Sequence, residues 1–145
     1  VWLSHAYLDL SLQYRVDKAN WYHRNFMEGI LISNHANASL SHRGRGFEVY
    51  TTRGETGADP LAERHWNNVE ELLGDRIAMR SNEADGDHDK EVNFYILKKT
   101  LMPAMLVEHL FFDNYQDALL LMDEEVVELF AEAQVRTVIQ HFNRG

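Results

Sequence analysis

The chain has 145 residues, of which 45% are hydrophobic and 11% aromatic, so it can bury the core of a single domain. Its formal net charge of −9 disfavours a nucleic-acid backbone or an anionic lipid surface as the main partner, because both would be repelled. The chain has no cysteine, which excludes disulfides, thiolate metal sites and cysteine nucleophiles. Its apolar runs are shorter than the roughly 20 residues that span a bilayer, so membrane insertion is not expected.

The first half of the chain predicts a helix between strands. After a short strand-like opening, residues 11–26 have the spacing of an amphipathic helix. The continuous apolar run at 30–33 predicts a strand of the kind that is covered on both faces of a sheet. A polar loop follows, and the alternating β-branched and aromatic residues at 47–52 predict a second strand.

The second half continues this alternation. A helix is expected over 60–75, followed by an acidic loop over 81–91 that we interpret as solvated rather than calcium-binding. Two further strands are predicted at 93–97 and 104–110.

The last third is expected to be helical. A short helix over 114–122 precedes a long amphipathic one over 123–142, whose predicted apolar stripe is Val127, Phe130, Ala131, Val135, Val138 and Phe142. Strands that alternate with helices predict an α/β fold, with a mostly parallel twisted sheet and helices on both faces.

Two polar residues end apolar strands, His35 after 30–34 and Glu108 after 104–107. Ligands of open α/β sheets bind outside the carboxyl ends of the strands, so neighbouring strands would bring this imidazole and this carboxylate to one crevice. A neutral imidazole can bind a metal, and a carboxylate can take a proton from a metal-bound water. The alternatives are a hydrogen-bonded structural histidine and a glutamate that caps a helix or pairs with an arginine.

The sequence lacks the other common catalytic motifs. It contains no HExxH, no GxSxG elbow, no Walker loop and no GxGxxG. We interpret the scattered histidines as surface or packing residues: His5, His23, His42, His65, His88 and His141.

Four segments follow one another in a specific order: LSLQYRVDKAN, ILISNHANAS, RGFEVYTTRGE and NFYILKKTLMPAMLVEHLFFDNYQDALLL. In this order they resemble the zinc-dependent N-acetylmuramoyl-L-alanine amidases, and the resemblance extends over nearly the whole chain. It implies a twisted sheet flanked by helices. It also implies a hydrolase that cleaves the amide between the lactyl group of N-acetylmuramic acid and L-alanine in peptidoglycan.

The resemblance assigns roles to both candidate residues. His35 matches the zinc-binding histidine of the His-Ala-Asn motif, and Glu108 matches the catalytic glutamate that ends the Leu-Val-Glu strand. Zinc would polarise the lactyl carbonyl, while Glu108 would take a proton from the attacking water and pass it to the departing alanine nitrogen. The same resemblance implies an extracytoplasmic location, in the periplasm, cell wall or medium, or a role in phage lysis.

The chain also departs from the family pattern. Asn34 stands where the family has isoleucine, and the Gly-His-Gly-Gly motif and the later glutamate that supply the other two zinc ligands do not occur. We therefore expect residues 1–145 to form one catalytic domain that is incomplete at its amino terminus, with those ligands upstream of Val1 and with an exposed sheet edge. His5 as a substitute ligand matches no family position.

Two other hypotheses remain open. One is a non-catalytic peptidoglycan-binding relative that has lost the metal, which the missing ligands would explain. The other is an unrelated α/β protein that uses its acidic surface for a protein partner.

Overall fold

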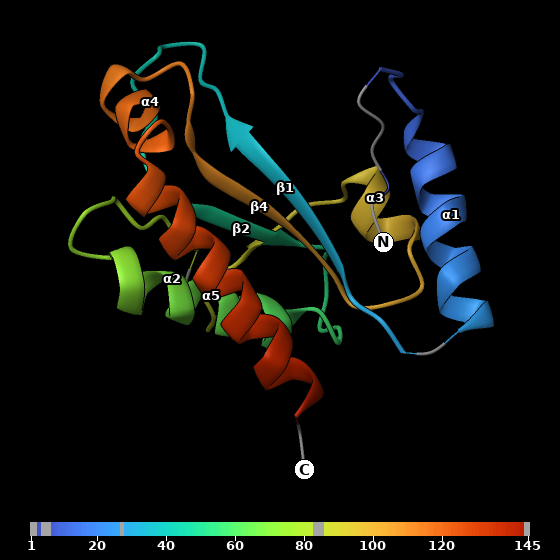
Figure 1. Ribbon diagram of the computed structural model, residues 1–145. Coiled ribbons are helices and arrows are strands. Elements are labelled where there is room, and N and C mark those ends of the chain that lie inside the picture. The colour runs from blue at the N-terminus through green and yellow to red at the C-terminus, as the bar shows by residue number, and fades with distance from the viewer. Residues whose placement is uncertain (1–2, 4–6, 27, 83–85, 144–145) are drawn as a thin grey trace.

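The computed structural model describes residues 3, 7–26, 28–82 and 86–143. Within them, a four-stranded sheet has the order β1-β4-β2-β3, from β1 (Leu31–Asn37), β2 (Glu48–Thr51), β3 (Lys90–Glu91) and β4 (Ala104–Phe111) (Figure 1). β1 pairs with β4 and β3 with β2 in parallel, whereas β2 and β4 are antiparallel. The predicted α/β fold with a mostly parallel sheet is confirmed.

Helices cover both faces of this sheet (Figure 1). On one face lie α2 (Asp59–Leu73) and α5 (Glu124–Phe142), which are extensively packed against each other. On the other face lie α1 (Leu12–Asn25) and the short α3 (Tyr95–Lys99). The remaining helix, α4 (Tyr115–Leu121), connects the end of β4 to α5. No described helix is both long and apolar enough to cross a membrane.

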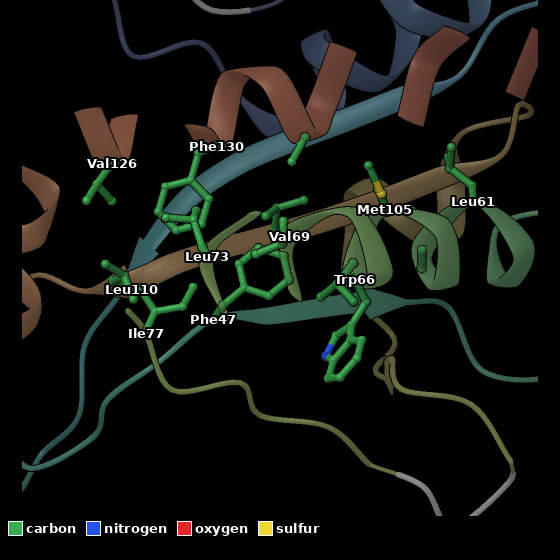
Figure 2. Packing of buried hydrophobic residues seen from close by; sticks show 14 residues of the cluster. Phe47, Leu61, Trp66, Val69, Leu73, Ile77, Met105, Leu110, Val126 and Phe130 are labelled. Atoms are coloured by element: carbon green, nitrogen blue, oxygen red, sulfur yellow. The ribbon is translucent and has the colours of Figure 1, made fainter. Parts of the chain in front are cut away.

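The alternation of side chains along the strands supplies a core to each face. Val49 and Val107 belong to the larger apolar cluster, which also contains residues of α2 and α5. Figure 2 shows Met105 of β4 in this cluster with Val69 of α2 and Phe130 of α5. Leu106 lies in the smaller cluster with residues of α1 and α3, and Tyr50 packs against it. The fully buried members of the larger cluster include Phe47, Leu61, Val69, Leu73, Met105, Leu110 and Val126.

Between β1 and β4 the register shifts directly after one pair of residues. His35 is opposite Glu108, but Asn37 is opposite Phe111, so β4 advances three residues while β1 advances two. This irregularity is a β-bulge, which adds one residue to one strand and re-aims the side chains that follow it.

Residues 93–97 do not form the predicted strand but belong largely to α3, so that prediction is wrong. The adjacent side chains of Ile96 and Leu97 are both buried in the cluster beneath α1, whereas a strand would direct them to opposite faces. The amide of Lys98 donates to the carbonyl of Phe94, which is a helical bond. The predicted opening strand lies partly outside the described residues, and residues 7–10 are not in a strand.

The long helix α5 buries a different stripe from the predicted one. Val126, Phe130, Ala133 and Thr137 are buried, whereas Val127 and Val135 are about half exposed. Of the predicted stripe, Phe130 is a core residue and Phe142 is 48% exposed. The helix therefore has two apolar rows, and only the row that begins at Val126 packs on the sheet.

Candidate active site

His35 and Glu108 are neighbours across two parallel strands. Their Cα atoms are partners in the β1–β4 register, and the strands continue beyond them to Asn37 in β1 and to Phe111 in β4. Adjacent strands lie about 4.8 Å apart, and residues directly opposite each other project to the same face. The structure therefore brings the predicted imidazole and carboxylate together, as expected if their strands were neighbours.

Glu48 of β2 extends this pair into a row of three residues that the sequence did not predict. It is the Cα partner of Glu108 on the opposite side from His35, and its side chain is almost fully buried. Its carboxylate accepts hydrogen bonds from Arg80 and Lys90 at one oxygen and from Tyr50 and Asn37 at the other. The signal that was available is an acidic residue inside the otherwise strand-like run at 47–52.

The carboxyl group of Glu108 is held in an environment suited to proton transfer. Burial, and then the negative charge of Glu48, raise the pKa of Glu108 from 4.5 to about 7. Its Oε2 atom is buried and makes no hydrogen bond to the part of the chain that the structure describes. A carboxyl group with a pKa near neutrality and a free oxygen can both accept and release a proton at physiological pH.

The imidazole of His35 is exposed at the edge of the sheet, and its lowered pKa favours the uncharged form. Burial, followed by the positive charge of Arg15, lowers the pKa of His35 below its usual 6.5. Its Nε2 lies 2.9 Å from the hydroxyl oxygen of Ser33, two residues earlier on the same face. A neutral imidazole is the form that binds metals, so His35 is chemically suited to be a ligand.

The described residues do not form a complete metal site. Among them, no group of three or more His, Cys, Asp or Glu side chains is placed to hold a metal ion. A catalytic zinc normally has three protein ligands, so His35 fits one ligand position while the full donor set is not met. His5, the proposed substitute, lies outside the described residues.

The other histidines that the structure describes have packing or surface positions. His65 and His109 lie on the opposite face against Phe47, and burial lowers the pKa of both, to about 3 and about 4. His88 stacks on Trp66 and pairs with a carboxylate of α2. His42 pairs with Asp113 in the loop after β1.

Two hollows run beside the outer strand β1, and His35 lines both. One, of about 670 Å³, lies between β1 and the exposed apolar row of α5, which includes Val127 and Val135. The other, of about 800 Å³, lies between β1 and α1 and includes Arg15. Glu108 lines neither hollow, because it lies one strand further inward.

Solved structures share the fold of this chain. An N-acetylmuramoyl-L-alanine amidase from Clostridium difficile 630 superposes with a TM-score of 0.77 at 24% identity, covering 94% of this chain and 68% of that one. The amidase AmiC2 of Nostoc punctiforme superposes with a TM-score of 0.75 at 26% identity, covering 94% of this chain and 68% of that one. Both likenesses support the fold.

Two curated sequence relatives are a phage endolysin and an N-acetylmuramoyl-L-alanine amidase. An endolysin of Bacillus phage SPP1 is 28% identical over 114 residues, which are 79% of this chain and 40% of the endolysin. The N-acetylmuramoyl-L-alanine amidase CwlM of Bacillus licheniformis is 29% identical over 134 residues, or 92% of this chain and 47% of CwlM. The chain thus spans less than half the length of either curated relative.

The family model described as N-acetylmuramoyl-L-alanine amidase matches residues 3–140, which is nearly the whole chain and includes all three residues of the row. The chain therefore belongs to the N-acetylmuramoyl-L-alanine amidase family.

Proposed function

We propose that this chain carries out peptidoglycan hydrolysis, cleaving the amide between N-acetylmuramic acid and the L-alanine of the stem peptide. The observation that supports this most directly is the carboxyl group of Glu108, which has a pKa of about 7, accepts no hydrogen bond at Oε2 from the described residues, and lies directly opposite His35. Membership of the amidase family supports the choice of an amide bond as the one cleaved. The row of His35, Glu108 and Glu48 contains side chains that can take part in amide hydrolysis.

Glu108 acts as the general base and then the general acid. In its ionised form it accepts a proton from the attacking water, whose oxygen forms the new bond to the lactyl carbonyl carbon. The carbon–nitrogen bond then breaks, and the same carboxyl group returns its proton to the departing nitrogen of L-alanine. A pKa of about 7 suits both steps, because neither protonation state is strongly preferred at neutral pH.

We also propose zinc as the cofactor, with His35 as one ligand. The neutral imidazole at the sheet edge is the supporting feature. The described residues do not complete a three-ligand set, so this proposal requires further ligands from residues other than those the structure describes.

The proposed substrate favours an activity outside the cytoplasmic membrane. Peptidoglycan is a wall polymer, so we propose action in the periplasm, the wall or the medium, or in phage lysis. The similarity to a phage endolysin and to CwlM is compatible with either setting.

Digestion of purified muropeptides by the full-length natural protein tests the function. Mass spectrometry of the products should find peptides with a free L-alanine amino terminus and glycans that keep the lactyl group. Glu108→Gln should abolish both products. Cleavage at another bond, or unchanged cleavage by Glu108→Gln, would contradict the proposal.

One observation favours a second candidate, a peptidoglycan-binding protein without turnover. The donor set for a metal is incomplete among the described residues. Sedimentation of the full-length protein with purified wall material, in the presence of a chelator and without release of peptides, would support binding alone.

A further inference from the structure

Glu48 is an unusually well-bound carboxylate for a residue next to a proposed catalytic group. It is 2% exposed, and its four donors come from four separate segments of the chain. Asn37 Nδ2 and the Tyr50 hydroxyl donate to Oε2 at 2.7 and 2.8 Å. Arg80 Nε and Lys90 Nζ donate to Oε1 at 2.6 and 2.5 Å. Both of its oxygens are thereby occupied, and its side chain has little freedom to turn toward substrate.

Glu108 lies one strand away on the same face and, unlike Glu48, has a carboxylate oxygen without a hydrogen-bond donor among the described residues. The two residues are Cα partners, and the oxygen without a donor is Oε2 of Glu108. Arg80 and Lys90 therefore both form ion pairs with Glu48. Neither of them forms an ion pair with the neighbouring carboxylate of Glu108.

Each of the two cations lies over an aromatic ring, Lys90 over Tyr50 and Arg80 over Phe111, and Lys90 is the less exposed of the two. The Arg80 guanidinium lies over the ring of Phe111 at 5.5 Å, and its backbone amide donates to the carbonyl of Phe47. Lys90 lies opposite Tyr50 in the β2–β3 register, so it shares the face of Glu48 and Glu108. Its ammonium sits on a flexible four-carbon stem, so Lys90 can take a new partner without the fixed planar geometry that the guanidinium of Arg80 requires.

We propose that Glu48 is a positioning residue that sequesters Lys90 and Arg80 and thereby leaves the carboxylate of Glu108 free to take a proton from water. This inference rests on the proposed function of Glu108. An ion-paired carboxylate has its oxygens occupied by donors, so it is a poorer proton acceptor. Without the negative charge of Glu48, the next carboxylate along this row is Glu108, about one strand spacing beyond Glu48 on the same face.

Glu48→Gln tests this proposal, because it removes the charge and keeps the shape. The expected result with muropeptides and the full-length protein is a fall in kcat of at least tenfold, with KM within about twofold. Adding Lys90→Met to this variant should recover at least threefold of the lost kcat, since the displaced cation is then absent. A merely structural role for Glu48 would not give such recovery, because a second substitution in the same network would lower activity further.

The matched control is Asp117→Asn. Asp117 is also buried, at 1% exposed, and it accepts hydrogen bonds from Arg45 Nε and from the backbone amides of Gly46 and Phe111. This substitution removes a comparable buried charge on the α4 side, so it should lower Tm without the fall in kcat. Glu48→Asp keeps the charge and should lose less activity than Glu48→Gln, and it provides a second variant if Glu48→Gln does not fold.

A crystal structure of Glu48→Gln provides a readout that is independent of activity. Lys90 Nζ within hydrogen-bond distance of a Glu108 carboxylate oxygen would support the proposal. Lys90 and Arg80 unmoved, with Glu108 still unpaired, would overturn it, as would an unchanged kcat or the absence of recovery by Lys90→Met. If the wild-type protein cleaves no muropeptide, the proposed function fails, while the structure of the variant still decides whether Glu48 sequesters the cations.

Discussion

His35 and Glu108, which are 73 residues apart in the sequence, are direct partners in the parallel register of β1 and β4. The pairing places an imidazole and a carboxyl group on one face of the sheet, about one strand spacing apart. It depends on the register between the edge strand β1 and the largely buried β4, because a slip of one residue would turn one of the two side chains to the opposite face. The apolar residues that fix the register therefore also fix the candidate site.

Glu108→Gln should abolish turnover while preserving the fold. General acid–base groups contribute roughly 10²- to 10⁴-fold to rate, so we expect a loss in kcat of at least about 100-fold. The release of peptides from muropeptides measures the loss, and circular dichroism checks the fold. Glu128→Gln, on the exposed side of α5, is the control and should keep full activity.

The activity should rise with pH through neutrality. Glu108 must be ionised to act as a base, and its pKa of about 7 places the acidic limb of the kcat/KM profile near pH 7 rather than near 4.5. A limb near pH 4.5 would contradict the environment described for this carboxyl group.

The same shift has a consequence for stability in the metal-free protein. A carboxyl group whose pKa is raised by folding binds its proton more tightly in the folded state, so it opposes folding increasingly as pH rises from about 4.5 to about 7. The difference in Tm between Glu108→Gln and the wild type should therefore grow in favour of the variant between pH 5 and pH 8. Parallel Tm curves over that range would contradict this expectation.

His35→Ala should reduce the zinc content of the full-length protein. A catalytic zinc site that loses one of three protein ligands is left with an incomplete set, so metal per protein measured by mass spectrometry should fall well below that of the wild type. His42→Ala is the control, because that imidazole pairs with Asp113 in a loop rather than facing Glu108. Equal zinc in His35→Ala and the wild type would exclude His35 as a ligand.

The stripe that α5 buries can be tested with two adjacent valines. Val126 is fully buried and Val127 is 49% exposed, so Val126→Ala should lower the free energy of unfolding by roughly 1–3 kcal/mol and Val127→Ala by less than about 1 kcal/mol. Chemical denaturation measures both values. Equal losses would contradict the burial described for α5, and a larger loss for Val127→Ala would mean that the helix packs through the predicted stripe.

Gly46 has a backbone conformation that a side chain would strain. Its φ is +108°, and an added Cβ would lie 2.4 Å from the carbonyl oxygen of Ala78. Gly46→Ala should therefore destabilise the protein by more than the roughly 1–3 kcal/mol expected from backbone strain alone. Gly54, at φ +89° with nothing near the added Cβ, is the matched control and should show the strain alone. Denaturation curves compare the two.

The candidate site was predictable from sequence only where a local pattern marked it. His35 and Glu108 each end an apolar run, and the rule that ligands bind at the carboxyl ends of strands connects them. The role of Glu48 was not predictable in this way, because its donors lie 11, 32 and 42 residues away for Asn37, Arg80 and Lys90. Only the folded sheet brings those segments together.

The errors in the fold have similar causes. Residues 93–97 are apolar without a clear period, so local pattern does not separate a buried strand from a short helix, and packing against α1 decides it. In α5, apolar residues occupy two neighbouring rows, and the sequence does not indicate which row the sheet covers.

The bulge after Glu108 fixes the number of residues that β4 can have between Glu108 and Phe111. The extra residue in β4 lets Leu110 enter the larger core and brings the amide of Phe111 to Asp117. Deleting one residue between 108 and 111 would restore even pairing at the cost of both contacts, and inserting one would displace α4 from its anchor. Across relatives with the same function, we expect substitutions in this stretch to be tolerated far more often than insertions or deletions.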